Sequence, residues 1–313
     1  ASGVLVYNNQ VTSGHKSSTF GVGGLIGKLE ASSLSGSTNA VNVTIKNFAP
    51  EKAASSTYVG VGGLVGSSYG VTIDSADVYS TISNSYNYGN LTSSQGNGSW
   101  QPCLGGIAGY AYKTNASNVT NGKADDKNVG NILITAGGCT GSGGIMGNLT
   151  AVNVDTATNY GNVELSIAMG YPYIGGCFGT LINSTGSIKN VDNYGALKVP
   201  NTSFGNGTPY FGGVIGRMAN TKWTIDDCDN YAPFTVKATF ASIKSGNMSC
   251  IGAIVGGTEG GTFKNCDNYA NMTVEGTWGK MTDAKNYGPS VYVGGVVGRI
   301  SDASAVIENC HNG

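Results

Sequence analysis

The chain has 313 residues, of which 51 are glycine, 17 are lysine or arginine, 18 are aspartate or glutamate and two are histidine. A formal net charge of −1 provides no basic surface for nucleic acid, and no apolar run approaches the ~18 residues of a membrane span. A hydrophobic content of 40% at this low net charge excludes a disordered chain, and the lack of a G-x-y period excludes collagen. The composition therefore indicates a folded protein with an unusual need for glycine.

A glycine-rich block, GGxxG, recurs along the whole sequence and defines its repeat. Eight copies start at Gly23, Gly62, Gly105, Gly143, Gly175, Gly212, Gly252 and Gly294, the seventh with alanine in second position. The step from Gly23 to Gly294 contains seven intervals, so the mean period is about 39 residues. A fixed period of this length is typical of solenoids and propellers, and it predicts a single repeat domain over residues 1–313.

A second signature, Asn-aromatic-Gly/Ala, travels with the first. It starts at Asn47, Asn87, Asn159, Asn193, Asn230 and Asn268, with a weaker copy at Asn128-Val129-Gly130. Just upstream, the later units align around Asn190, Asp227, Asn265 and Asn309. Asn and Asp tolerate the left-handed conformation, so these four positions predict a corner between two short strands. The preceding residues, Lys189, Asp226, Lys264 and Glu308, alternate in charge, which favours stacked copies in register.

Each unit thus contains three short strands: one around GGxxG, one ending near the Asn corner, and one after the aromatic-Gly pair. Stacking the units as coils would bury a continuous core and pair each strand with its copies in neighbouring coils. We therefore expect an all-β, right-handed parallel β-solenoid (β-helix) of about eight coils. A β-propeller is the alternative, because about 40 residues also suffice for a blade, but the short unit between Gly143 and Gly175 favours the solenoid. Residues 123–127 interrupt the third unit and are expected to loop out.

The blocks GGLIG, GGLVG, GGIMG, GGVIG and GGVVG resemble the GLUG-motif repeats of secreted and surface-attached bacterial proteins, and the IxNCxN stretches resemble parallel β-helix repeats. The resemblance covers the whole chain. It implies an extracellular or cell-surface location and a structural or adhesive role, and it carries no set of catalytic residues.

Three of the seven cysteines, Cys228, Cys266 and Cys310, share one apolar column of the repeat. They are either buried thiols that act as small hydrophobic residues or partners in disulfides between neighbouring coils. The sequence has no CxxC pair and only two histidines, so a zinc site is not expected.

Asp192, Asp229 and Asp267 share another column, directly before the Asn of the second signature. Stacked carboxylates repel unless something compensates, so these three are candidate calcium ligands; the competing interpretation is that they turn into solvent beside lysines. A lyase-like reaction would also need a base and a positioned cation, yet the two arginines, Arg217 and Arg299, lie about two units apart. We assign no catalytic residue and expect no cofactor.

Two further sets of residues are candidates for glycan chemistry. The tryptophans Trp100, Trp223 and Trp278 could stack on sugars, whereas the tyrosine column is better explained as a packing ladder. N-x-S/T sequons, which are potential glycosylation sites, lie at Asn42, Asn90, Asn97, Asn115, Asn118, Asn148, Asn183, Asn201, Asn206, Asn247 and Asn271, against about six expected from composition.

The sequence as a whole predicts a non-catalytic extracellular or cell-surface protein with a structural or adhesive role. Its expected partners are other copies of itself, stacked head to tail into a filament, or a glycan or protein of a cell surface, with no nucleic acid and no membrane span. The alternative is a carbohydrate-binding or polysaccharide-lyase-like protein that uses a groove built by loops on the β-helix.

Overall fold

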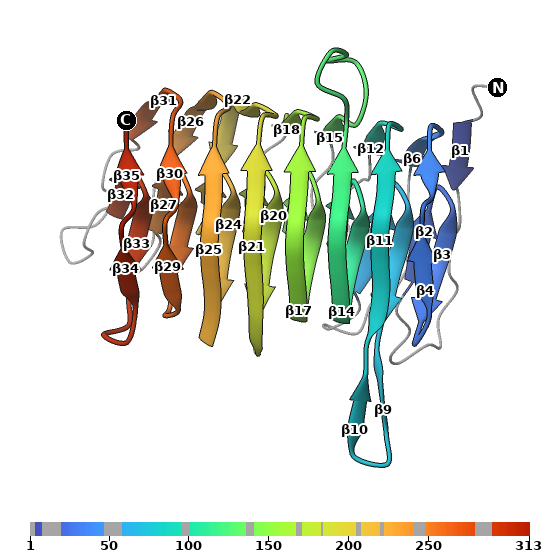
Figure 1. The fold of residues 1–313 in the computed structure, drawn as a ribbon. Helices are drawn as coiled ribbons and strands as arrows, with labels where there is room; N and C mark the ends of the chain where they lie inside the picture. The colour runs from blue at the N-terminus through green and yellow to red at the C-terminus, as the bar shows by residue number, and fades with distance from the viewer. Residues whose placement is uncertain are drawn as a thin grey trace, which may run out of the picture.

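The computed structural model describes residues 4–7, 20–46, 58–94, 101–135, 141–166, 171–182, 184–204, 208–219, 222–240, 248–278 and 290–313. Their strands stack side by side along one axis, from β1 at one end to β35 at the other (Figure 1). No helix occurs in these ranges.

Three sheets run along the stack. Sheet 1 has eight strands: β1 (Val4–Tyr7), β6 (Asn42–Lys46), β12 (Leu91–Ser94), β15 (Ile132–Ile134), β18 (Val163–Leu165), β22 (Leu197–Phe204), β26 (Phe234–Phe240) and β31 (Met272–Trp278). Sheet 2 has eight: β2 (Phe20–Gly23), β7 (Tyr58–Gly62), β13 (Gln101–Gly105), β16 (Gly141–Gly143), β19 (Tyr173–Gly175), β23 (Tyr210–Gly212), β27 (Met248–Gly252) and β32 (Ser290–Gly294).

Sheet 3 has 17 strands, because it folds around two sides of each coil. They are β3 (Ile26–Glu30), β4 (Ser33–Ser35), β5 (Thr38–Asn39), β8 (Val65–Tyr69), β11 (Ser80–Asn87), β14 (Ala108–Asn121), β17 (Met146–Asn159), β20 (Phe178–Ile182), β21 (Thr185–Asn193), β24 (Ile215–Ala219), β25 (Lys222–Asn230), β28 (Val255–Thr258), β29 (Thr262–Lys264), β30 (Asp267–Asn268), β33 (Val297–Ile300), β34 (Val306–Glu308) and β35 (His311–Asn312).

The strands of sheets 1 to 3 pair in parallel, each with its copy one unit away. Antiparallel pairing among the described residues is confined to a bridge between Lys123 and Asp126 and to the hairpin β9 (Val71–Ile73) and β10 (Ala76–Val78), which projects from the stack (Figure 1). Propeller blades are antiparallel sheets, so this pairing excludes the propeller and confirms the parallel β-solenoid.

The predicted corners are also present. Asn190, Asp227, Asn265 and Asn309 all have left-handed backbone conformations, with φ between 51° and 54°. The alternating charges stand in register as expected: Lys189 lies beside Asp226, and Lys264 lies beside Glu308 with an ion pair of 2.8 Å.

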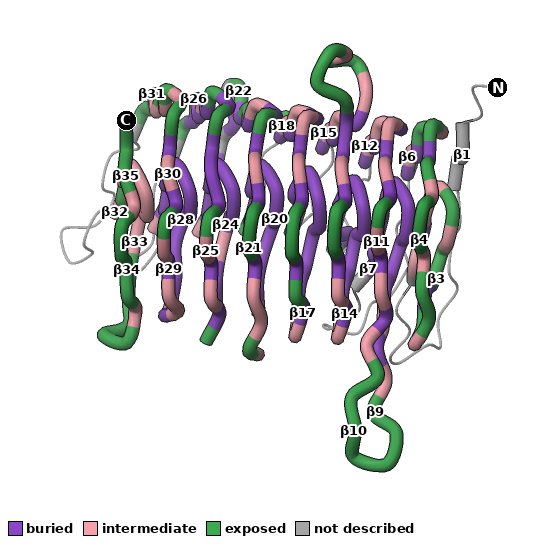
Figure 2. The backbone as a smooth tube through the Cα atoms, viewed as in Figure 1, coloured by how far each residue is buried: buried purple, intermediate pink, exposed green. Residues whose placement is uncertain are grey.

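The core consists of two separate hydrophobic columns that run the length of the stack. One is enclosed by sheet 3 and contains Ile82, Val154 and Phe263; the other lies between sheets 1 and 2 and contains Val61 and Leu165. Most of the backbone that surrounds both columns is buried in the middle of the stack and exposed at its two ends (Figure 2).

A line of asparagines, buried in every unit except the last, separates the two columns. Each one ends a strand of sheet 3, and in all but the last unit its Nδ2 donates to the Oδ1 of its copy in the next unit at 2.8–2.9 Å. We call these residues the Asn ladder: Asn39, Asn87, Asn121, Asn159, Asn193, Asn230, Asn268 and Asn312. The backbone N–H two residues on, for example that of Gly161, donates to the same Oδ1, which fixes which side of each amide carries the oxygen.

The GGxxG block lies where sheet 2 turns into sheet 3, and its second glycine faces the Asn ladder. A Cβ on Gly63 would come within 2.2 Å of both Asn87 Cγ and the Gly106 carbonyl oxygen. A Cβ on the last glycine, Gly66, would come equally close, at 2.2 Å, to the backbone nitrogen of Val22 in the neighbouring unit. The two sequence signatures therefore lie in contact, between the two hydrophobic columns of the coil.

Two members of the second signature were placed wrongly by sequence reasoning. The ladder residue of the first unit is Asn39, since Asn39 bonds Asn87, and Asn47 lies outside the described residues. In the third unit the ladder residue is Asn121, not Asn128. There, residues 123–127 do loop out, as expected, and Gly130 supplies the carbonyl that accepts from Asn121 Nδ2 at 2.7 Å.

The ladder predicts a stability difference between two asparagines of β17. Asn159→Ala removes a fully buried amide that bonds Asn121, Asn193 and the Gly176 carbonyl. Each buried group left without a partner costs about 1–3 kcal/mol, so the free energy of unfolding should fall by about 3 kcal/mol or more. Asn153→Ala is the control, because Asn153 bonds Asn115 in an exposed position, and it should change stability by less than about 0.5 kcal/mol. Urea titration followed by circular dichroism measures both, and equal losses would contradict a special role for the ladder.

Candidate functional site

The outer face beside the Asn ladder carries two columns of functional groups. Because neighbouring side chains on a strand alternate in direction, the residues just before and just after each buried ladder asparagine point outward. In the later units these are Asp192, Asp229 and Asp267 before it, and Tyr194, Tyr231 and Tyr269 after it.

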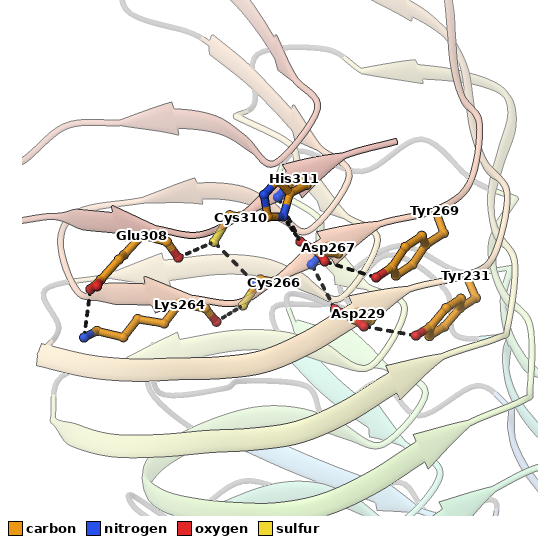
Figure 3. Close-up of polar contacts among 9 residues, drawn as sticks. All are labelled: Asp229, Tyr231, Lys264, Cys266, Asp267, Tyr269, Glu308, Cys310 and His311. Atoms are coloured by element: carbon orange, nitrogen blue, oxygen red, sulfur yellow. Dashed lines mark hydrogen bonds and ion pairs between the residues drawn. The ribbon is translucent and has the colours of Figure 1, made fainter.

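Two aspartates of the column, Asp229 and Asp267, are held by protein donors. Asp229 accepts from the backbone N–H of Asp267 at 2.8 Å and from the Tyr231 hydroxyl at 3.0 Å (Figure 3). Asp267 repeats the pattern with the N–H of His311 at 2.9 Å and the Tyr269 hydroxyl at 3.0 Å. The carboxylates therefore brace one coil against the next and orient the tyrosines.

The ionisation of these carboxyl groups follows their burial. Burial raises the pKa of Asp229 above its ordinary value, against the opposing hydrogen bonds from Asp267 and Tyr231. Burial and the neighbouring Asp229 charge raise the pKa of Asp192 in the same way. At Asp267 burial acts in the same direction, but the hydrogen bonds from His311 and Tyr269 outweigh it and lower the pKa.

The three aspartates do not compose a calcium site in this arrangement. They stand in one column, as the sequence predicts, but the described residues contain no group of three or more His, Cys, Asp or Glu side chains that could hold a metal ion. Nor are all three turned into solvent, since Asp229 is only 9% exposed.

The tyrosines form the packing ladder that the sequence favours. Rings of Tyr160, Tyr194, Tyr231 and Tyr269 stack with centroid separations of 5.2, 4.8 and 4.8 Å. Offset stacked rings contribute about 0.5–1.5 kcal/mol per pair beyond their burial. Tyr88 packs on Tyr86 instead, because Gly122 occupies the ladder position in the third unit.

The cysteine column consists of free thiols in this structure. Cys228 and Cys266 are fully buried and Cys310 is half-buried in the last unit. The Cys266 thiol donates to the Lys264 carbonyl at 3.0 Å, and the Cys266 N–H donates to Cys310 Sγ at 3.4 Å (Figure 3). Burial raises the pKa of the Cys228 thiol well above its ordinary value, whereas the hydrogen bond with Cys228 lowers the pKa of the Cys266 thiol. Both side chains are fully buried and pack in the core as small hydrophobic residues do.

The sequence alone does not reveal which residues Arg217 contacts. Its guanidinium lies 4.9 Å from the Tyr173 ring centroid and 5.3 Å from that of Tyr210, and it pairs with Glu259 at 2.8 Å. These contacts tie three units together, so Arg217 serves as a packing cation between them.

The structure corrects one of the tryptophan candidates. Trp223 is 1% exposed and lies in the core of sheet 3, against Gly186 of the neighbouring unit, so its indole cannot stack on a sugar. Trp100 lies outside the described residues, as does the side chain of Trp278 at the end of β31.

The sequons fall into contrasting environments. Asn42 and Asn271 are exposed, Asn115 is half-buried, and the amide nitrogens of Asn90 and Asn118 donate to Asn128 and Asn84 at 2.8 Å. Asn148 is 2% exposed, so a glycan there is incompatible with this packing. The remaining sequon side chains, those of Asn97, Asn183, Asn201, Asn206 and Asn247, lie outside the described residues.

The last described unit, β32 to β35, presents positions that inner units bury. Ile307 is 44% exposed, whereas its register partner Phe263 is fully buried. Val293 of β32 is likewise exposed while its partner Ile251 is buried. Figure 2 shows this exposed end coil beside the buried middle of the stack.

Comparisons of the chain with protein-family models, with curated proteins and with solved structures find no match. Within the described residues there is also no helix of the length and apolarity that a membrane crossing requires.

The aspartate column predicts opposite pH effects for two substitutions. A raised folded pKa means that Asp229 contributes stability below the pKa of the unfolded chain and loses it as pH rises. Asp229→Asn should therefore gain stability relative to the wild type as pH rises from about 3 to 7. Asp267 has a lowered pKa, so Asp267→Asn should lose relative stability over the same range. Thermal unfolding of both variants at several pH values measures these changes, and trends of the same sign would show that the pKa values of Asp229 and Asp267 are not shifted in opposite directions.

The cysteine column predicts a pattern of alkylation. In the native protein iodoacetamide should modify Cys310 before Cys228 and Cys266, because the latter thiols are buried. After denaturation without reductant, mass spectrometry should find all three modified. Pairs of unmodified cysteines under those conditions would show disulfides between coils.

Proposed function

We propose that this is a non-catalytic structural repeat protein of the extracellular space or cell surface, and that copies of it stack head to tail. The parallel β-solenoid, the resemblance of the GGxxG blocks to GLUG repeats and the excess of sequons support this proposal. The observation that carries it is the match between the two end coils.

The Asn ladder has a direction, and its two ends are complementary. Every inner Nδ2 donates toward the later unit, so Asn312 receives from Asn268 at 2.8 Å and its own Nδ2 donates to no described residue. At the other end Asn39 Oδ1 accepts from the Val41 N–H at 3.0 Å but from no ladder amide of the described residues. A second copy placed on the last coil would continue the ladder with the same donor and acceptor geometry.

The apolar and charged columns continue across the same junction. Leu34, Ile82 and Phe263 belong to the column that ends at Ile307, so stacking would place Ile307 of one copy on Leu34 of the next. Arg299 belongs to the column that begins at Lys28, so the same junction would set these two cations side by side, with the Glu30 carboxylate that pairs with Lys28 at 2.6 Å as the opposing charge. Parallel edge strands left open are templates for further strands, and a contact of this head-to-tail kind need not close.

Head-to-tail stacking predicts which surface residue blocks assembly. Wild-type chains should form rods whose length grows with concentration, and Ile307→Asp should leave them as monomers, because it places a charge in the junction. Val78→Asp is the matched control, since Val78 is also an exposed apolar residue but lies on the β9–β10 hairpin. Analytical ultracentrifugation and electron microscopy measure both. Monodisperse wild-type monomers at high concentration, or equal effects of the two substitutions, would rule stacking out.

A further inference from the structure

A groove of about 630 Å³ lies on the outer face where the third unit loops out over the tyrosine ladder. Its lining includes Lys123 and Lys127 from the loop, Tyr160 and Tyr194 from the ladder, and Lys198 from β22. The volume is within the 300–1,000 Å³ typical of small-molecule sites. The groove is separate from the two end coils at which stacking is proposed.

The groove exists because the third unit replaces one tyrosine with a loop. In the fourth unit Asn159 is followed directly by Tyr160 and Gly161, whereas in the third unit residues 123–129 stand between Gly122 and Gly130. Gly122 has no side chain to cover Tyr160, and its backbone approaches the Tyr160 main chain instead. One end of the tyrosine stack is therefore left without an aromatic neighbour from the third unit.

The loop that overhangs the groove is held in place. The Asp126 N–H donates to the Lys123 carbonyl at 3.2 Å, closing a turn, and the Asn128 N–H donates to Asp126 Oδ1 at 2.9 Å. The Asn131 amide donates to the Lys127 carbonyl at 3.0 Å. The lysines of the loop therefore extend from a fixed backbone, which lowers the entropy lost when a ligand binds.

The charged residues that line the groove are all lysines. Lys123 pairs with Asp125 at 3.0 Å, while among the described residues neither Lys127 nor Lys198 forms an ion pair. Glu164 is the strand neighbour of Lys198 but accepts from the Ser166 hydroxyl at 2.7 Å. Two cations thus stay available beside aromatic rings.

We propose that this groove binds an acidic oligosaccharide built of hexuronate units. Lys127 and Lys198 would bind the sugar carboxylates through charge-assisted hydrogen bonds, and the uncovered end of the tyrosine stack at Tyr160 would contact the apolar face of a sugar ring. The amide of Asn162, which also lines the groove, can bond sugar hydroxyls.

Titration calorimetry of the 313-residue chain with trigalacturonate tests the proposal. Saturable binding is expected, weaker at higher salt, and Lys127→Gln with Lys198→Gln should weaken it at least tenfold. The matched control is Lys46→Gln with Lys222→Gln, two exposed lysines outside the groove, which should bind as the wild type does. Tyr160→Ala should also weaken binding, whereas Tyr269→Ala, at the far end of the stack, should not. Unchanged melting temperatures establish that each variant is folded.

The proposal is wrong if the wild type shows no saturable heat with trigalacturonate, or if the groove double variant binds trigalacturonate as tightly as the wild type does. Equal affinity for a neutral galactose trisaccharide would show that the sugar carboxylates do not contribute to binding. Equal affinity for acetate would show that the sugar ring does not contribute. Tighter binding of a sulfated trisaccharide would reassign the groove to sulfate groups.

Discussion

Hydrogen bonds between buried asparagine amides connect every described unit of the solenoid to the next, and the other features of the structure depend on the register they set. An amide is well suited to this role because it offers a donor on one side and an acceptor on the other, so identical residues can bond one another along a line. Burial makes the bonds costly to lose. Glycine is needed at Gly63 because a Cβ there would occupy the space of Asn87; the seventh unit has the small residue Ala253 at the same position.

The same register explains why like side chains line up in columns on the outer face. Once Asn193, Asn230 and Asn268 are aligned inside, the residues on either side must align outside, so aspartates lie over aspartates and tyrosines stack on tyrosines. Repulsion between the carboxylates is offset by backbone N–H donors from the next coil. The columns are thus consequences of the ladder, and the groove arises at the one described unit where the tyrosine column is interrupted by Gly122 and the loop after it.

Much of this could be predicted from the sequence, for reasons that particular residues make plain. The parallel solenoid, the left-handed corner at Asn190 and the alternating charges at Lys264 and Glu308 follow from residue types that recur within each unit. Asn121 could not be recognised as a ladder residue, because glycine follows it and the loop separates it from its partner Gly130. The burial of Trp223 could not be predicted either, because its ring occupies the space that a side chain at Gly186, in another coil, would need. Contacts between units are invisible in the pattern of any one unit.

The most direct test of the Asn ladder is hydrogen exchange of its side-chain amides, followed by nuclear magnetic resonance. The Nδ2 protons of Asn87, Asn121, Asn159 and Asn193 should exchange as slowly as the backbone amides of sheet 3, because both should require the coils to separate. The exposed amide of Asn153 should exchange rapidly. Rapid exchange of the ladder amides in an otherwise protected protein would contradict the central role given to these bonds.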